Sequence, residues 1–247
     1  MANINETGHA KNVANFEKLV TRVASLGAVY NPSRESLTIT ALNALLASAR
    51  EAVHNVHNAE AAYKHAVGER ELAFDQLRKL TTRINNALKA SSSTSRDDAS
   101  VMTLIRKLQG RRATPKMTPE ERKAAEAAGI VKNEISSSQL GYDNRLDNLD
   151  KLLKLLITIP EYAPNEPELT THALAQLHTD LARRNSDVAN SAVQLANARI
   201  ARDARLYSAL NGMVDISVDV KMYVKSVYGT TNPYYKALST LKFSKQN

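Results

Sequence analysis

Residues 15–19 (NFEKL) and residues 148–152 (NLDKL) share nearly the same five letters, and they belong to a repeat that runs through most of the chain. Residues 30–32 (YNP) return as residues 162–164 (YAP), 132 positions later (30 to 162). The same spacing pairs Leu37 with Leu169, Ala41 with Ala173, Leu42 with Leu174, Leu45 with Leu177 and Arg70 with Arg202. A match that extends over a helix, a loop and the next helix indicates an internal tandem duplication.

Each copy of the repeat contains one very long apolar pattern. From Leu42 to Ala87, the small and apolar positions recur at alternating spacings of three and four, which is typical of a coiled-coil seam. The pattern predicts long helices over about residues 37–90 and 170–227, each preceded by a shorter helix. Gly68 or Gly212 could instead mark a hairpin break in its own helix.

The predicted fold is therefore all-α: an elongated helical bundle built from two copies of one unit with pseudo-two-fold symmetry. We expect a first repeat at residues 1–105, a basic linker at residues 106–141 and a second repeat at residues 142–247. Within the linker, Thr118 and Glu121 flank Pro119 as a capping box, which predicts one short helix there.

Composition points to a globular protein without a membrane span. Of the 247 residues, 43% are hydrophobic and 23% are charged, which is ordinary for such a chain. No stretch of about 18 apolar residues is present, so no transmembrane helix is predicted. Residues 1–20 lack the apolar core of a secretion signal, so a cytoplasmic location is expected, although a secreted protein with its signal removed would look the same.

The positive charge is concentrated in two places. The net charge is +8, and residues 106–123 and residues 221–247 are both strongly basic. The first cluster predicts contact with an acidic partner or a nucleic acid, through Arg106, Lys107, Arg111, Arg112 and Lys116. Arg199, Arg202 and Arg205 recur every three residues, which is also the pattern of a phosphate-binding ridge or of an ordinary solvated helix face.

Arg70 and Arg202 occupy the same seam position in the two repeats. An arginine there either packs its stem and extends its head to solvent, or meets an acid of the other repeat in a paired structural site. Glu69, Glu71 and Asp203 are the candidate acids.

Nothing in the sequence predicts an enzyme. The chain has no cysteine, and it lacks the phosphate-binding glycine loops and the hydrolase and zinc-protease motifs. Glu51 and His54 have the spacing of a di-metal ligand pair, but Arg183 and Ser186 stand at the equivalent positions of the second repeat. We therefore expect no catalytic residues, no cofactor and no metal.

The C-terminal third carries a resemblance. Residues 197–207 (NARIARDARLY), residues 220–229 (VKMYVKSVYG) and residues 241–243 (LKF) together resemble the C-terminal signature of uncharacterised all-helical proteins of environmental bacteria. The resemblance implies a helical fold and brings no activity with it.

These features favour a structural or scaffold protein that assembles with itself into oligomers or filaments. The long helices present apolar stripes, and the C-terminal tail is expected to anchor on a neighbouring chain through Tyr234, Tyr235, Leu238, Leu241 and Phe243. The alternatives are a basic protein associated with nucleic acid and, third, a membrane-active helical protein.

Overall fold

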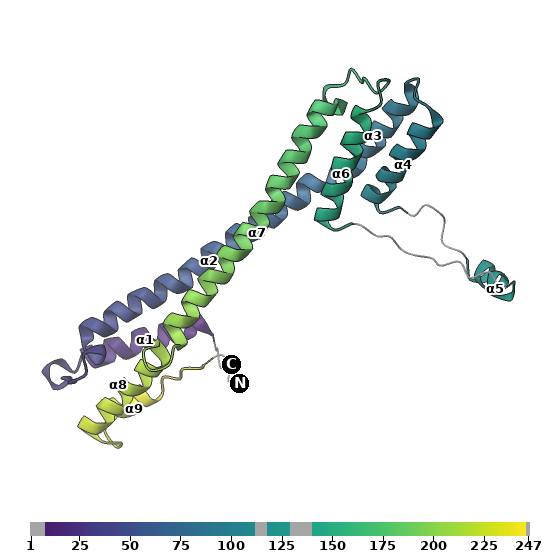
Figure 1. The fold of residues 1–247 in the computed structure, drawn as a ribbon. Helices are drawn as coiled ribbons and strands as arrows, with labels where there is room; N and C mark the ends of the chain where they lie inside the picture. The colour runs from purple at the N-terminus through teal and green to yellow at the C-terminus, as the bar shows by residue number, and fades with distance from the viewer. Residues whose placement is uncertain (1–7, 112–117, 129–139, 246–247) are drawn as a thin grey trace. The chain divides into compact units, whose positions relative to one another are not determined.

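The computed structural model describes residues 8–111, 118–128 and 140–245, and every regular element in those ranges is a helix (Figure 1). The α-helices are α1 (His9–Ala24), α2 (Ile39–Asp75), α3 (Leu77–Ala90), α4 (Ser95–Gln109), α5 (Pro119–Ala127), α6 (Tyr142–Ile157), α7 (Thr171–Tyr207), α8 (Met213–Tyr228) and α9 (Pro233–Ser239). Short 3-10 turns are η1 (Gly27–Val29), η2 (Glu35–Leu37) and η3 (Pro167–Leu169). The all-helical class predicted from the sequence is confirmed.

The chain forms two compact units, and each contains segments from both halves of the sequence. The first unit holds the described residues up to Lys64 and those from Ser191 onward, and the second runs from His65 to Asn190. The long helices α2 and α7 therefore contribute residues to both units. These two units are not the predicted repeats, which follow one another along the chain. The boundaries of the repeats therefore stay a prediction.

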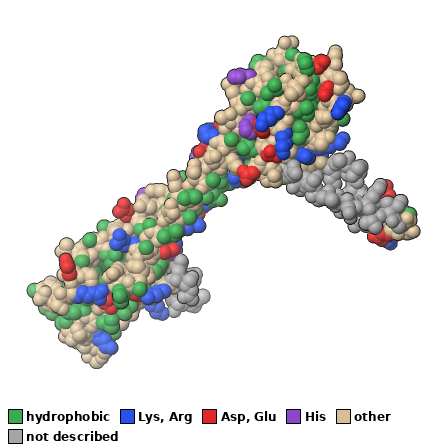
Figure 2. Space-filling model, viewed as in Figure 1, with side chains coloured by type: hydrophobic (Ala, Val, Ile, Leu, Met, Phe, Trp, Pro, Cys, Tyr) green, Lys and Arg blue, Asp and Glu red, His purple; other side chains and the backbone are tan. Residues whose placement is uncertain are grey.

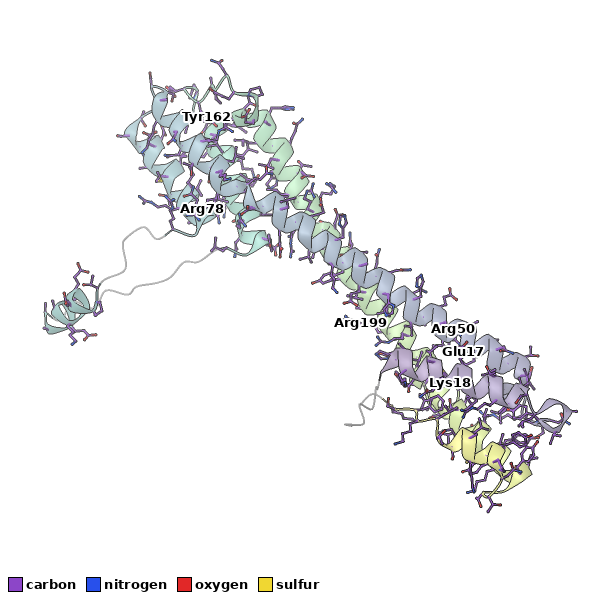
Figure 3. The ribbon with its side chains drawn as sticks, turned by 180° about the vertical axis from the view of Figure 1, so that it is seen from behind. Glu17, Lys18, Arg50, Arg78, Tyr162 and Arg199 are labelled. Atoms are coloured by element: carbon purple, nitrogen blue, oxygen red, sulfur yellow. The ribbon has the colours of Figure 1, made fainter. Side chains whose placement is uncertain are left out.

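The first unit has one apolar core, to which α1, α2, α7, α8 and α9 all contribute. Phe16, Leu19 and Val23 on α1 are fully buried because they lie on one face of the helix at spacings of three and four. They pack with Leu42 of α2 and Val220 of α8 in the same cluster. A 2.5 Å ion pair between Arg50 and Glu17 joins α2 to α1, and Figure 3 labels both residues.

In the second unit, the buried residues of α6 are spaced like those of α1. Leu149, Leu152 and Leu156 of α6 are buried at the spacing that Phe16, Leu19 and Val23 have in α1. Their cluster includes residues of α3 and α4, and these two helices pack closely against each other. Helix α5 begins with the predicted capping box, in which Glu121 N–H donates to the Thr118 hydroxyl and Thr118 N–H donates to the Glu121 carboxylate.

The loop before each long helix has the same internal bonds in both units. The Tyr30 hydroxyl donates to the Leu37 carbonyl oxygen at 2.7 Å, and the Tyr162 hydroxyl donates to the Leu169 carbonyl oxygen at 2.8 Å. At the start of α2 the hydroxyl of Thr38 accepts from the backbone N–H three residues later, and Thr170 does the same for α7. Helices α2 and α7 are each 37 residues long.

Of the two glycines considered as break points, Gly68 lies within continuous α2 and Gly212 lies at a real interruption. Gln76 separates α2 from α3, yet its backbone keeps helical angles (φ −67°, ψ −22°), so the chain keeps its helical path through this residue. Around Gly212, by contrast, α7 stops at Tyr207 and α8 begins only at Met213. Leu210 in this interruption has a left-handed φ of 69°.

Candidate functional site

Arg70 on α2 lies against the first residue of α6. Its guanidinium carbon is 3.8 Å from the centre of the Tyr142 ring, and its Nη1 donates to Asn185 Oδ1 at 3.1 Å. A cation over an aromatic face is held by the ring's negative π surface. The structure thus gives Arg70 a ring and an amide as partners, rather than the carboxylate that the sequence suggested.

Arg202 occupies the corresponding position in the first unit. It bonds the neighbouring Asp203, with Nη2 2.8 Å from Oδ1, and its side chain is 11% exposed. It also lies near His9, the first residue of α1: burial, and then the positive charge of Arg202, lower the pKa of that imidazole. Asp203 is one of the candidate acids, but it neighbours Arg202 in the chain, whereas the prediction paired each arginine with an acid of the other repeat.

At both positions, an arginine of a long helix lies beside the first residue of a shorter helix. Arg70 lies beside Tyr142 of α6, and Arg202 lies beside His9 of α1. In the second unit, Tyr142 also makes an edge-on contact with Phe74, with ring centres 4.9 Å apart. Arg145 Nη2 donates to the Phe74 carbonyl at 2.6 Å, and burial lowers the pKa of Arg145. These are packing contacts that hold helices together, and none supplies a general base or a nucleophile.

Three of the five predicted basic linker residues fall within the described part of the chain, at or just beyond the C-terminal end of α4. Arg106 and Lys107 lie half-buried in the last turn of α4, where positive charge suits the negative end of the helix dipole. Arg111 is exposed just beyond that helix. Arg112 and Lys116 lie outside the described residues.

The C-terminal tail packs on its own unit. Leu238 and Leu241 are 1% and 7% exposed and belong to the first core, and Tyr235 and Phe243 pack against that core from its edge. The expectation that these side chains anchor on a neighbouring chain is therefore corrected, because their apolar faces are already covered. Tyr234, by contrast, is 56% exposed.

Side-chain amides of α1 hold the end of the tail in place. Asn15 Nδ2 donates to the Lys242 carbonyl and Asn12 Nδ2 donates to the Ser244 carbonyl, each at 2.8 Å. Lys221 of α8 donates to the Leu241 carbonyl, and burial lowers the pKa of this lysine. The tail is thus a built-in part of the first unit.

The second unit has a groove of about 510 Å³ between the C-terminal part of α3 and the loop that precedes α7. Its lining comprises Arg83, Asn86, Ala87, Ala90, Ser91, Glu161, Tyr162, Ala163, Pro164, Asn165, Glu166 and Leu169. Figure 3 shows Tyr162 at the end of this unit that lies away from Arg78. Burial raises the pKa of Tyr162 to about 12.

The corresponding place in the first unit is filled by a tyrosine of the chain itself. Tyr223 of α8 meets the Tyr30 ring edge-on at 5.3 Å between ring centres, and its hydroxyl accepts from Asn31 N–H at 3.2 Å. Helix α8 begins 136 positions after α3 (77 to 213), and counting back 136 positions from Tyr223 gives Ala87, which lines the groove and whose side chain is too small to occupy the same space. The sequence reasoning missed this groove, because the spacing of 132 changes to 136 at the interruption before α8.

Carboxylates surround the groove. Arg83 Nη2 is 2.7 Å from Glu168 Oε1, and this hydrogen bond lowers the pKa of Glu168. Glu161 and Glu166 line the opening and are exposed. With three carboxylates near one guanidinium, the rim is acidic in a protein whose net charge is +8.

Other chemistry that the sequence raised finds little support in the described residues. They contain no group of three or more His, Cys, Asp or Glu side chains arranged to hold a metal ion. Nor does any helix among them combine the length and hydrophobicity needed to cross a bilayer. Comparison with protein-family models, curated proteins and solved structures finds no match to this chain.

Proposed function

We propose that this protein is a non-enzymatic structural protein that associates with further copies of itself through the outer face of α7. The observation that carries the proposal is the exposure of two large aliphatic side chains one heptad apart: Val193 is 59% exposed and Ile200 is 67% exposed. On the face shown in Figure 2, hydrophobic side chains lie at the surface among Lys and Arg side chains.

The exposed side chains form a stripe at coiled-coil spacing. Val193, Asn197, Ile200 and Ala204 follow each other at steps of four, three and four, so they share one face of α7, and all four are exposed. The opposite face of the helix carries Leu206, which is fully buried in the first core. We call these four residues the α7 stripe.

A second copy of the same stripe is the partner that fits it best. When two copies run antiparallel about the point midway between Asn197 and Ile200, Val193 of each faces Ala204 of the other, a large side chain against a small one. The contact is then self-complementary, as a two-fold interface must be. The stripe is about 17 Å long, so one such contact is small and its affinity is modest.

We also propose that α1 to α4 and α6 to α9 are two copies of one duplicated unit related by a pseudo-two-fold axis. The matched bonds of Tyr30 and Tyr162, the equal lengths of α2 and α7 and the shared burial pattern of α1 and α6 support it. The elongated bundle expected from the sequence remains a prediction, which small-angle scattering tests.

Sedimentation velocity over a wide range of concentration tests the self-association. Ile200→Lys places a charge in the middle of the α7 stripe, and we expect the association to weaken roughly tenfold or more. His54→Lys adds the same charge at an exposed position of α2 in the same unit, and it should leave the association nearly unchanged.

A protein that stays monomeric at every concentration overturns the proposal, as does an equal effect of both substitutions. A gel shift with nucleic acid at physiological salt that fades steeply as salt rises would instead favour the nucleic-acid alternative. Leakage from liposomes would favour the membrane-active one.

A further inference from the structure

We propose that the groove of the second unit, between α3 and the loop at residues 161–169, receives Tyr234 of another copy of this chain. This inference rests on the proposed self-association and adds a second, different contact to it.

The first unit shows what this kind of groove holds. There, the Tyr223 ring stands at 88° to the Tyr30 ring, and its hydroxyl accepts a backbone hydrogen bond from Asn31. Edge-to-face packing of this kind adds to the burial of the aromatic surface itself. The site is therefore a pocket for a phenol side chain, and in the first unit the chain fills its own pocket.

The second unit has the same walls without the phenol. Tyr162 is fixed as Tyr30 is, by its hydrogen bond to the Leu169 carbonyl, and its side chain lines the groove. Ala87 of α3 stands where the first unit has Tyr223 of α8, and its methyl group leaves the space beside Tyr162 open. The volume of about 510 Å³ leaves room for an aromatic ring from another molecule.

Charge indicates which molecule supplies the ring. The rim of the groove carries Glu161, Glu166 and the Arg83–Glu168 pair, so its balance is negative. The chain from residue 221 to its end contains lysines and no acid. A segment from that region of a second copy therefore meets the rim with complementary charge.

Within that basic region, Tyr234 is the tyrosine in position to enter a groove. It follows Pro233 in the first turn of α9, where the Asn232 side chain accepts from its N–H, and it is 56% exposed. Lys236 is exposed two residues later, within reach of the acidic rim when the ring is inserted. Tyr235 is held against the core of its own unit.

This contact joins unlike surfaces. Tyr234 of one copy enters the groove of the next, whose own Tyr234 is still available, so such contacts build chains or rings. The α7 stripe, by contrast, pairs like with like and stops at two copies. Together the two contacts give a branched or layered assembly, and removing one contact leaves the other.

The decisive substitution is Ala87→Tyr, which gives the second unit the tyrosine that the first unit already has. We expect this variant to fold and to lose the species larger than the dimer made by the α7 stripe. Ser92→Tyr adds the same residue at a nearby position, which is exposed and does not line the groove, and it should assemble like the unchanged protein. Tyr234→Ala should behave like Ala87→Tyr, because it removes the other side of the contact.

Mixing the variants gives a test that loss of folding cannot imitate. The Ala87→Tyr chain keeps Tyr234, and the Tyr234→Ala chain keeps the open groove, so a mixture should form a one-to-one pair through a single groove contact. Labelling the two chains with different dyes and sedimenting them together detects that pair. Each variant is combined with Ile200→Lys in this experiment, so that the α7 stripe does not contribute.

The outcomes separate the two proposals. Large species that persist in both Ala87→Tyr and Tyr234→Ala overturn the groove contact and leave the α7 stripe standing. Large species that vanish in both variants while Ile200→Lys has no effect overturn the α7 stripe and support the groove. A mixture that gives no one-to-one pair also overturns the groove contact, and a wild-type chain that is always monomeric overturns both proposals.

Discussion

The Tyr162 hydroxyl bonds the carbonyl oxygen of Leu169, seven residues along the chain, inside the core of the second unit. The bond closes the loop between α6 and α7 with a side chain, where the proline at residue 164 and the proline at residue 167 limit the backbone's own hydrogen bonding. Tyr30 and Leu37 make the same closure in the first unit. A phenol is therefore a structural brace in both loops.

Tyr162→Phe keeps the ring and removes the brace, and it should lower the free energy of unfolding by about 1 kcal/mol, the usual net value of one such hydrogen bond. Tyr30→Phe should cost about the same, because its bond has nearly the same length and burial. Urea denaturation followed by circular dichroism measures both. Tyr234→Phe removes an exposed hydroxyl and serves as the control, and equal losses in all three variants would contradict the brace.

Stability should also fall at alkaline pH. Burial raises the pKa of Tyr162 to about 12, above its ordinary value of 10. Between pH 10 and pH 12 the unfolded chain loses this proton while the folded chain keeps it, so the folded state is disfavoured as pH rises. The contribution is fully present below pH 10, and on the order of 2 kcal/mol is lost by pH 12.

Unfolding curves collected from pH 8 to pH 11.5 would show this loss. In Tyr162→Phe the slope should be smaller, since the phenol that titrates is absent. The remaining slope comes from the other tyrosines, Tyr30 included, because burial raises its pKa as well. A pH profile unchanged by Tyr162→Phe would show that this phenol is not linked to folding.

Much of the helical structure could be predicted from the sequence, because local patterns specify it. The apolar pattern predicts a shorter helix before each long one, and α1 and α6 stand at those places. The capping box at Thr118 is present as predicted. These features depend on residues three or four apart, so the chain's local order determines them.

What could not be predicted depends on which surfaces meet. The amphipathic pattern at Leu238 and Leu241 shows that these residues need an apolar partner, but it does not say whether that partner is on the same chain. The partners of Arg70 could not be predicted for the same reason, because Tyr142 and Asn185 come from distant parts of the sequence. The groove is a further case, since pairing Ala87 with Tyr223 requires the observed starts of α3 and α8, which lie 136 and not 132 residues apart.

Replacing Gly68 and Gly212, the two possible break points of the long helices, with alanine should change the free energy of unfolding in opposite directions. A Cβ at Gly68 meets nothing within 4 Å, and the residue lies inside α2, so Gly68→Ala should stabilise the protein by roughly 0.5–1 kcal/mol. A Cβ at Gly212 would lie 2.6 Å from the Ser208 carbonyl oxygen, which belongs to the backbone. Gly212→Ala should therefore cost about 1–3 kcal/mol.

Thermal melting of the two variants beside the unchanged protein gives the comparison directly. Each serves as the other's control, because the chemical change is the same. If Gly212→Ala is neutral, the interruption between α7 and α8 is not held as the structure has it. A destabilising Gly68→Ala would mean that α2 is not continuous there.

For the C-terminal tail, the structure and the sequence lead to opposite expectations about the effect of removing it. From the sequence alone, deleting residues 233–247 should leave a folded protein with a smaller assembly. In the structure, Leu241 is buried in the first core, and Asn15 of α1 bonds the carbonyl of the following residue. Leu241→Ala should thus cost about 2 kcal/mol or more, by lost burial and the cavity left behind. The deletion should cost more, because it also uncovers the surface that Leu238 shields.

Hydrogen exchange shows where the loss falls. Amides of α1 and α8 should exchange faster in Leu241→Ala, because both helices pack on the tail, while those of α4 and α6 should change least. Tyr234→Ala, at an exposed position of the same segment, should change the free energy of unfolding by less than about 0.5 kcal/mol. Should the deletion leave α1 and α8 as protected as before, the tail would not be part of the first core. Its apolar side chains would then be available to a neighbouring chain, as the sequence alone suggested.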